Sequence, residues 1–180
     1  NNLRFICYLC DDMSITKTSD KKYHKINSIE KDHPCFGYLE VCYLKNPMLY
    51  VTTPVMKCLW GVQKKGGNSF QMNLQFTNLE EDPYMKSFFD FVQNTEFMCM
   101  KKLGLTEDDA DKFISEIQYD KNEIYEPSLQ VKLPFRYNQF LVDLYSDFSS
   151  SVNIFSINKF QKMECDLFVD RVWKMNEKFY

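Results

Sequence analysis

The sequence predicts a mainly β protein in which a small closed or partly closed barrel carries an inserted helical segment. Three observations indicate this class. Before residue 77 and after residue 127, short segments alternate apolar and polar residues with a period of two, which is typical of half-buried strands. Between residues 82 and 118, apolar residues instead recur at helical spacing. Strands on both sides of one helical region, joined by short turns, favour a barrel with an insertion.

Residues 1–36 contain one strand signal followed by a long polar stretch. Residues 1–10 are apolar and alternate, which predicts a strand. Residues 11–34 are rich in Lys, Ser, Thr and Asp, and we interpret them as a long loop or mobile arm. We therefore expect residues 1–36 to pack on, or to precede, a single barrel domain that covers residues 37–180.

The expected barrel strands are bounded by proline, glycine and other turn residues. They lie at residues 37–44, 48–53, 57–62 and 69–76 before the insertion, and at residues 129–133, 140–145, 152–157 and 162–173 after it. Residues 64–68, with the sequence Lys-Lys-Gly-Gly-Asn, predict a hairpin turn because glycine adopts positive φ angles without steric cost.

The inserted segment begins with a helix-start signal and is predicted to hold two helices. Asp82 is a suitable N-cap, and Pro83 suits the first helical position because the N–H that it lacks would have no helical partner there. The first helix is expected to end just before Gly104. Thr106 and Asp109, three residues apart, predict a capping box that opens a second helix, which extends to about residue 118.

The charge composition limits the kinds of partner. The 180-residue chain has 22 Lys and Arg against 25 Asp and Glu, a formal net charge of −3, and a pI near 5.5. This balance argues against a protein that wraps duplex DNA by bulk positive charge, so any nucleic-acid site has to be a local patch. No apolar run approaches the ~20 residues that span a bilayer, and we expect a soluble protein without membrane contact.

Seven cysteines are scattered through apolar stretches of the chain. We interpret them as small buried hydrophobic residues without intramolecular disulfides, and we expect an intracellular, reducing compartment. Cys7 and Cys10, together with His33 and Cys35, superficially offer four zinc ligands. The cysteine pair lies in a predicted strand rather than on a tight knuckle, so neither a metal site nor a cofactor is expected.

Several segments resemble one protein family. Residues 47–62 (Pro-Met-Leu-Tyr-Val-Thr-Thr-Pro-Val-Met-Lys-Cys-Leu-Trp-Gly-Val) contain a Thr-Pro-x-Met-Lys run. Residues 125–134 (Tyr-Glu-Pro-Ser-Leu-Gln-Val-Lys-Leu-Pro) contain a Leu-x-Val-Lys-Leu-Pro strand. With residues 69–76, the Phe-Phe-Asp-Phe stretch at 88–91 and the late strand that leads to Trp173, they resemble the podophage-type single-stranded DNA-binding proteins of nucleocytoplasmic large DNA viruses.

The resemblance implies an OB-fold, here a five-stranded barrel between about residues 37 and 173, with the helical insertion between its third and fourth strands. It further implies sequence-independent binding of single-stranded DNA in viral DNA replication, recombination or repair, without enzymatic activity. The implied location is the viral factory in the host cytoplasm, or the nucleus. Replication proteins and further copies of the chain are candidate partners.

Binding of single strands requires basic side chains for phosphates and exposed rings on which bases stack. The first candidate group, in the hairpin region, consists of Lys57, Trp60, Lys64, Lys65 and Phe70. The second, which begins in the strand at 129–133, consists of Lys132, Phe135, Arg136 and Tyr137. A third group consists of Lys159, Lys162, Arg171, Trp173 and Lys174. The alternative interpretation is that the rings belong to the core and that the basic residues are solvated turn residues.

No catalytic motif accompanies these groups. Both histidines lie in the polar arm, and the sequence contains neither a glycine-rich phosphate loop nor a nucleophile motif. The acidic run at residues 107–111 is interpreted as helix-start charge rather than as a metal cluster. Two alternatives to DNA binding stay open: a structural or scaffold protein of a large DNA virus that uses its barrel for protein contacts, and an enzyme without a recognisable signature.

Overall fold

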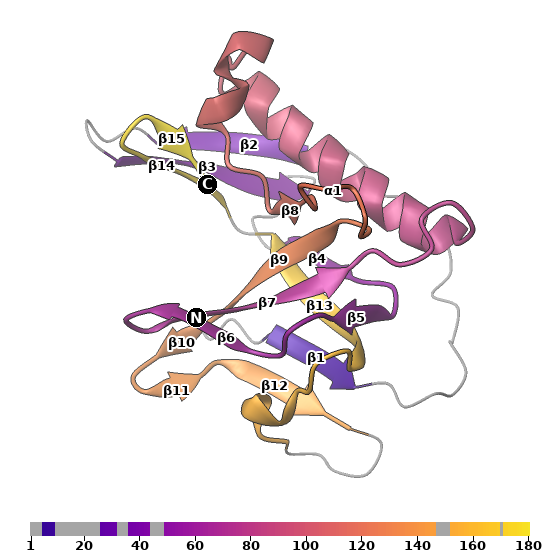
Figure 1. Ribbon diagram of the computed structural model, residues 1–180. Helices are drawn as coiled ribbons and strands as arrows, with labels where there is room; N and C mark the ends of the chain where they lie inside the picture. Colours follow the sequence, from indigo (N-terminus) through magenta and orange to yellow (C-terminus); the bar gives the residue numbers. More distant parts are fainter. Residues whose placement is uncertain (1–4, 10–25, 32–35, 44–48, 147–151, 170) are drawn as a thin grey trace. The chain divides into compact units, whose positions relative to one another are not determined.

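A computed structural model of the chain describes residues 5–9, 26–31, 36–43, 49–146, 152–169 and 171–180 (Figure 1). Contacts along the chain divide it into two compact units. The first unit comprises Asn1–Lys17, Thr52–Phe88 and Ile117–Leu167, and the second comprises Thr18–Val51, Phe89–Glu116 and Phe168–Tyr180. All members of the first two candidate groups belong to the first unit.

A curled, mostly antiparallel sheet lies mainly in the first unit, while most of β4 and the last residues of β13 are assigned to the second (Figure 1). Its strands follow the order β12-β1-β13-β5-β7-β9-β8, with β4 also paired to β13 and β6 to β7. Their bounds are β1 (Phe5–Leu9), β4 (Leu49–Thr52), β5 (Met56–Cys58), β6 (Gln63–Gly66), β7 (Ser69–Gln75), β8 (Ile117–Gln118), β9 (Ser128–Leu133), β12 (Val142–Tyr145) and β13 (Lys162–Val169). A separate two-stranded hairpin consists of β10 (Phe135–Arg136) and β11 (Gln139–Phe140). The predicted class is confirmed: the chain is mainly β, barrel-like and OB-fold-like, with an inserted helical segment.

The strand count differs from the expected five. Among the described residues the main sheet contains nine strands, and the strand predicted within residues 1–10 is one of them. This strand, β1, lies inside the sheet, parallel to β12 on one side and antiparallel to β13 on the other. Neither neighbour is close to β1 in sequence, so local patterning could not reveal the pairing.

Strand β7 explains which face of the sheet forms the core. Phe70, Met72 and Leu74 are buried, and each lies opposite a buried aliphatic residue of β9. Burying one such side chain contributes about 1.5–3 kcal/mol. The intervening Gln71 and Asn73 lie on the opposite face, where Gln71 is 7% exposed and Asn73 is half-buried, and their amide nitrogens donate to polar side chains of β9 at 3.1 and 3.4 Å. The strand predicted over residues 69–76 is therefore confirmed with its apolar face in the core, although Gln71 on its polar face is buried as well.

The inserted helix α1 (Pro83–Lys102) begins where the sequence predicts it. The Oδ1 atom of Asp82 accepts hydrogen bonds from the backbone N–H of Tyr84 at 2.9 Å and of Met85 at 3.2 Å. These bonds satisfy two of the N–H groups that lack a partner at a helix start. Gly104 has a φ angle of +70° just beyond the last helical residue, as expected of a glycine that ends a helix.

The second inserted helix is shorter than predicted. It is a single 3-10 helix, η1 (Glu107–Lys112), rather than a helix that extends to residue 118. The capping box is formed, because Asp109 Oδ2 accepts a hydrogen bond from Thr106 N–H at 3.1 Å. Beyond the helix the chain is extended, and Ile114 N–H donates to the Phe179 carbonyl at 2.8 Å. Pairing with a distant segment thus replaces the helical continuation.

The second unit contains a four-stranded antiparallel sheet in the order β15-β14-β3-β2. Its strands are β2 (Ile26–Lys31), β3 (Phe36–Tyr43), β14 (Arg171–Met175) and β15 (Lys178–Phe179). The interpretation of residues 26–31 as part of a polar arm is wrong, since β2 pairs with β3 over its whole length. The strands expected at 37–44 and beyond residue 170 also belong to this sheet rather than to the barrel. A strand pattern predicts extended backbone, but it does not select the partner.

Residues 152–157, where the sequence predicts a strand, instead contain a short 3-10 helix, η2 (Ile154–Ser156). The side-chain oxygen of Asn153 accepts a hydrogen bond from Phe155 N–H at 2.9 Å, and Ser156 Oγ donates to the Asn153 carbonyl at 2.6 Å. Asn and Ser side chains that bond to nearby backbone compete with strand pairing. Local polar contacts therefore override the apolar pattern of this segment.

Three cysteines of the described chain, Cys58, Cys99 and Cys165, are buried. Their burial agrees with the interpretation of the cysteines as small apolar core residues. Three of the four superficial zinc ligands, Cys10, His33 and Cys35, lie outside the described residues. Within the described part of the chain, no group of three or more His, Cys, Asp or Glu is arranged to hold a metal ion. No helix in this part of the chain is long and apolar enough to cross a membrane.

Candidate nucleic-acid interface

Basic and acidic residues are segregated along the chain. Residues 52–79, 127–142 and 152–163 contain seven Lys and Arg and no Asp or Glu, although the whole chain is acidic. All three segments belong to the first unit. The seven residues, here called the basic surface, are Lys57, Lys64, Lys65, Lys132, Arg136, Lys159 and Lys162. Lys57 is half-buried and the other six are exposed, so a protein of net charge −3 carries a local cationic patch.

The first two candidate groups, far apart in sequence, meet around the ring of Phe70. Its centroid lies 4.9 Å from that of Phe135 and 4.8 Å from that of Phe140, two residues that face each other in the β10–β11 hairpin. Phe155 of η2 completes this aromatic cluster at 6.1 Å from Phe70. Lys64 Nζ of β6 lies 5.8 Å from the Phe70 centroid. The cluster therefore holds the β6–β7 and β10–β11 hairpins together.

Burial divides the rings of this cluster into core and surface. Phe70 is 8% exposed, so its faces are covered by neighbouring side chains and its role is structural, which is the core alternative for this residue. Phe135 is half-buried. Phe155 keeps 59% of its surface exposed, although its local sequence predicts a strand and does not single it out. Its position in the acid-free segment 152–163 is the signal that could have found it.

The β10–β11 hairpin presents Arg136 and Tyr137 to solvent. Tyr137 and Asn138 have φ angles of +53° and +60°, the type I′ geometry that joins two antiparallel strands through two residues. This turn favours Asn and Gly, and tyrosine adopts the left-handed conformation at a steric cost. Tyr137 is nevertheless 92% exposed. The turn thus extends an aromatic ring into solvent beside a guanidinium group.

Lysines of neighbouring strands lie on the outward face of the main sheet. Lys132 of β9 pairs in register with Gln71, which pairs in turn with Gln63 of the β6–β7 hairpin. Lys57 of β5 lies directly opposite Lys162 of β13. The outward face therefore carries basic side chains on three strands of the sheet, β5, β9 and β13.

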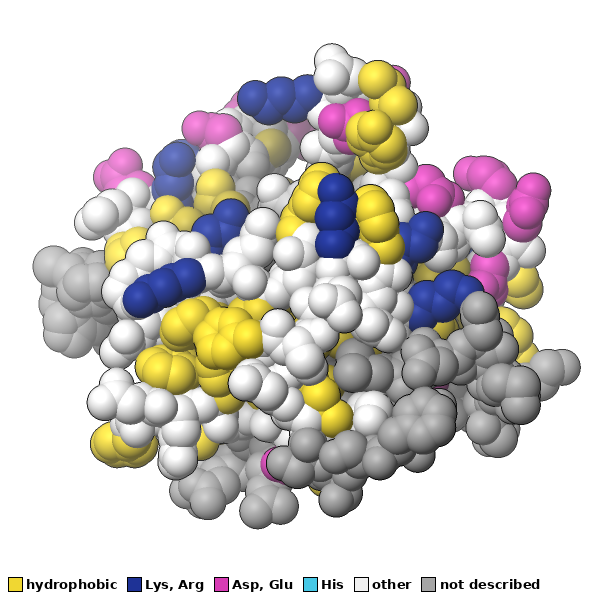
Figure 2. Space-filling model, turned by 60° about the horizontal axis from the view of Figure 1, so that its bottom comes forward, with side chains coloured by type: hydrophobic (Ala, Val, Ile, Leu, Met, Phe, Trp, Pro, Cys, Tyr) yellow, Lys and Arg dark blue, Asp and Glu magenta, His cyan; other side chains and the backbone are white. Residues whose placement is uncertain are grey.

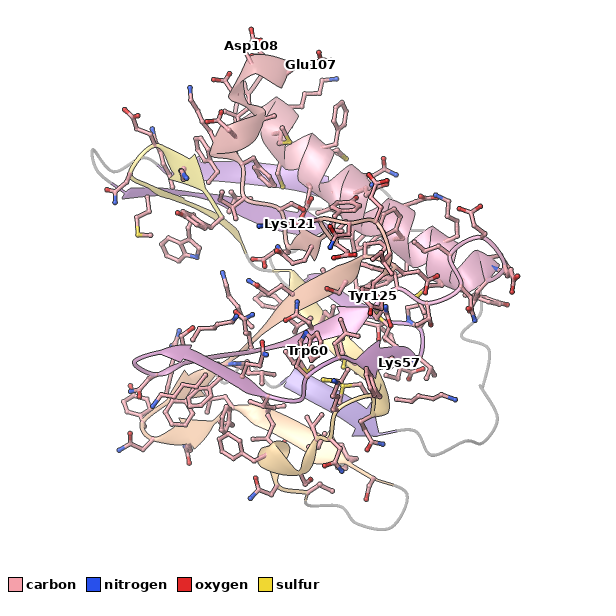
Figure 3. The ribbon with its side chains drawn as sticks, in the orientation of Figure 1. Lys57, Trp60, Glu107, Asp108, Lys121 and Tyr125 are labelled. Carbon is pink, nitrogen blue, oxygen red and sulfur yellow. The ribbon has the colours of Figure 1, made fainter. Side chains whose placement is uncertain are left out.

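Trp60 lies on the surface, in the segment between β5 and β6 (Figure 3). It is 53% exposed, so the core interpretation does not apply to it. Lys159 Nζ lies 4.7 Å from the ring centroid of Trp60 and 4.7 Å from that of Phe160. Phe160 is 54% exposed and was not among the predicted residues. Figure 2 shows the same combination more generally, with basic side chains directly beside hydrophobic ones on the face in view.

The third candidate group does not come together within one unit. Lys159 and Lys162 belong to the first unit, whereas the other members lie on β14 in the second. There Trp173 is 47% exposed, and Lys174 Nζ lies 5.9 Å from the Phe179 ring centroid. Only Lys159 and Lys162 are therefore retained in the candidate interface.

Acidic residues limit the basic surface along β13. Glu164 and Asp166 follow Lys162 at intervals of two residues and so share its face of the sheet. Burial, and after it the charge of Asp166, raises the pKa of Glu164 above its usual value. Thr52 Oγ1 donates a hydrogen bond to Asp166 Oδ1 at 2.6 Å. The basic surface thus ends at Lys162 on this strand.

The acidic run at the start of η1 is engaged in contacts of the helix itself. Lys112 Nζ donates to Asp109 Oδ1 at 2.6 Å, and this bond, followed by those from Thr106, lowers the pKa of Asp109 to about 2. Glu107 and Asp108 are exposed in the first turn (Figure 3), where the helix dipole favours negative charge. The geometry is that of a helix start, as the sequence predicts.

Comparison of the chain with protein-family models, curated proteins and solved structures finds no match. The resemblance of residues 47–62 and 125–134 to single-stranded DNA-binding proteins therefore stays a prediction. The basic surface and the exposed rings beside it are the features of the chain that indicate a function.

Proposed function

We propose that this chain binds single-stranded DNA without sequence specificity and without catalysing a reaction. The observation that carries the proposal is the combination, within the first unit, of a basic surface in acid-free segments and exposed aromatic rings. The exposed rings of this unit include Trp60, Tyr137, Phe155 and Phe160. Phosphates would contact the lysines and Arg136, while bases would stack on the rings.

Single strands fit this arrangement better than a duplex does. Bases within a duplex stack on one another and do not offer their faces to side chains, whereas unpaired bases gain about 1–3 kcal/mol each from stacking on a protein ring. A net charge of −3 supplies no overall attraction to a rigid polyanion. The resemblance noted above supports the same function, and the proposal extends to viral DNA replication, recombination or repair, with replication proteins as candidate partners.

Titration with labelled oligo-dT tests the proposal directly. We expect tighter binding to oligo-dT than to a duplex of equal length, with log affinity falling against log salt by about 0.7 for each phosphate contact. Fluorescence anisotropy at several salt concentrations measures both quantities. If oligo-dT shows no salt-dependent binding, the proposal is wrong and a role in protein contacts takes its place.

Replacing Lys64 and Lys65 together by alanine is expected to reduce the steepness of the salt dependence by up to about 1.4, because two phosphate contacts are lost. Affinity should fall most at low salt. The matched control is the double alanine variant of Lys101 and Lys102, an exposed lysine pair in the last turn of α1. Equal effects of the two double variants would show that only net charge matters and that the basic surface is not the binding site.

Replacing Trp60 by alanine is expected to weaken oligo-dT binding by about 1–3 kcal/mol with little change in the salt slope, because a stacked ring displaces few counterions. The control is Trp173→Ala, which removes a similarly exposed indole from the second unit. Thermal unfolding of both variants checks that the fold is intact. A folded Trp60 variant that binds like the parent at every salt concentration would exclude stacking on this ring.

A further inference from the structure

Trp60 and Phe160 surround one ammonium group. Lys159 Nζ lies 4.7 Å from each ring centroid, and more than half of each ring is exposed. These two rings, here called the aromatic slot, therefore have an occupant that the chain itself supplies. The occupant is attached through a flexible four-carbon stem and can leave without moving the backbone.

The backbone on both sides of the slot is held by the main sheet. Cys58 N–H donates to the Gln161 carbonyl at 2.8 Å, and Phe160 N–H donates to the Cys58 carbonyl at 2.6 Å. On the Trp60 side, Gly61 has a φ angle of +71°, and a Cβ atom there would lie 2.6 Å from the Ile157 carbonyl oxygen. The two segments that carry the rings are thus in direct backbone contact, which fixes the backbone positions from which both rings extend.

Phe160 adopts a backbone conformation that its side chain disfavours. Its φ angle is +66°, and Gln161 N–H closes the turn by donating to the Asn158 carbonyl at 3.2 Å. Gly or Asn is the usual residue at such a position of a turn, and bulky residues there are uncommon. Strain of this kind persists only where the surrounding structure enforces it, and it clusters at functional sites. The ring itself is exposed, so burial in the core does not account for it.

We infer that the aromatic slot takes up a single base of the bound strand, in exchange for the Lys159 ammonium. This inference rests on the proposed function and names the place where one base is inserted. Each exposed cation–π contact changes an equilibrium about two- to fivefold, so the two contacts of Lys159 together contribute about 4- to 25-fold, whereas stacking of a base gains about 5- to 150-fold from each ring. The base therefore outcompetes the ammonium. The released Lys159 side chain then reaches a neighbouring phosphate.

A double-mutant cycle between the two rings tests whether they hold the same base. Trp60→Leu and Phe160→Asn each remove one ring, and asparagine tolerates the positive φ angle of position 160. We expect each variant to weaken oligo-dT binding about 5- to 150-fold and the double variant to bind much more tightly than the product of the two effects predicts. The control cycle pairs Trp60→Leu with Tyr137→Asn, which removes a ring from the equally left-handed hairpin position, and its effects should multiply.

The Lys159→Gln variant tests whether the Lys159 ammonium is displaced from the aromatic slot by a base or only contacts a phosphate. The variant should bind more weakly than the parent at low salt, where a phosphate contact is lost. At high salt, where that contact is screened, it should bind up to about 25-fold more tightly, because both cation–π contacts of the competitor for the slot are gone. In a Trp173→Phe background, which leaves Trp60 as the one tryptophan, acrylamide should quench the free Lys159→Gln variant more than the free parent.

Three results would overturn the inference. One is that Lys159→Gln binds more weakly at every salt concentration, and another is that the Trp60 and Phe160 effects multiply. The third is that Phe160→Asn binds like the parent while the Lys64 and Lys65 double variant binds more weakly. In each of these cases DNA binding itself stands and only the slot fails. If the parent does not bind oligo-dT, the proposed function fails together with the slot.

Discussion

Truncating Phe70 to alanine is expected to lower the free energy of unfolding by about 3–5 kcal/mol, the range observed for large aromatic residues in protein cores. Phe70 is 8% exposed and lies opposite Leu133 in the sheet, with the rings of Phe135 and Phe140 within 5 Å of its own. Removal of the ring would leave a cavity at the point where the two hairpins meet. Urea denaturation followed by circular dichroism measures the effect.

The matched control for this change is Phe155→Ala. It removes a ring of the same cluster that is 59% exposed, so much less apolar surface returns to water and the expected loss is about 1 kcal/mol. The Phe70 variant should also bind oligo-dT more weakly, because Lys64 and Arg136 would no longer be held on adjacent hairpins. Equal stability of the Phe70 variant and the parent would contradict the placement of this ring in the core.

Replacing Gly61 by alanine is expected to cost about 2–4 kcal/mol of stability. The φ angle of +71° alone costs a non-glycine residue about 1–2 kcal/mol. The new Cβ atom would also lie 2.6 Å from the Ile157 carbonyl oxygen, a backbone atom that cannot move without disturbing the contact between the two segments of the aromatic slot. Thermal unfolding by differential scanning calorimetry measures the loss.

Gly67→Ala separates the two contributions to this cost. Gly67 has a φ angle of +50° in the β6–β7 turn, and no atom lies within 4 Å of the position that its Cβ atom would take. Its replacement should therefore cost only the conformational part, about 1–2 kcal/mol. If both glycine variants lose the same stability, the close approach of Gly61 to Ile157 is not present in solution.

Local sequence was sufficient where the physical cause is local. The alternation over residues 69–76, the Asp82 cap before Pro83 and the capping box at Thr106 each depend on groups within one strand or one helical turn, and the structure contains all three. The glycine pair at 66–67 likewise predicts the β6–β7 hairpin, because glycine tolerates the positive φ angles of a tight turn. Both residues have positive φ angles in the structure.

Strand pairing was decided only by the tertiary structure. β1 lies between β12 and β13, and β2 pairs with β3 in a sheet separate from the barrel. Strand edges present the same backbone donors and acceptors whatever their sequence, so a strand pattern does not name its partner. The helix predicted after Thr106 is too long for the same reason. Beyond its actual end, Ile114 N–H donates a hydrogen bond to the carbonyl of Phe179, a residue far away in the sequence.

In the candidate site, too, one part was determined by the sequence and another only by the tertiary structure. The sequence by itself determined which residues are basic and that Lys57, Lys64, Lys132 and Arg136 belong to segments without acidic residues. It could not determine which rings accompany them at the surface. A phenylalanine gains free energy wherever it is covered, and whether a distant segment covers it depends on the fold. The fold buries Phe70 under the two hairpins and leaves Phe160 exposed beside Trp60.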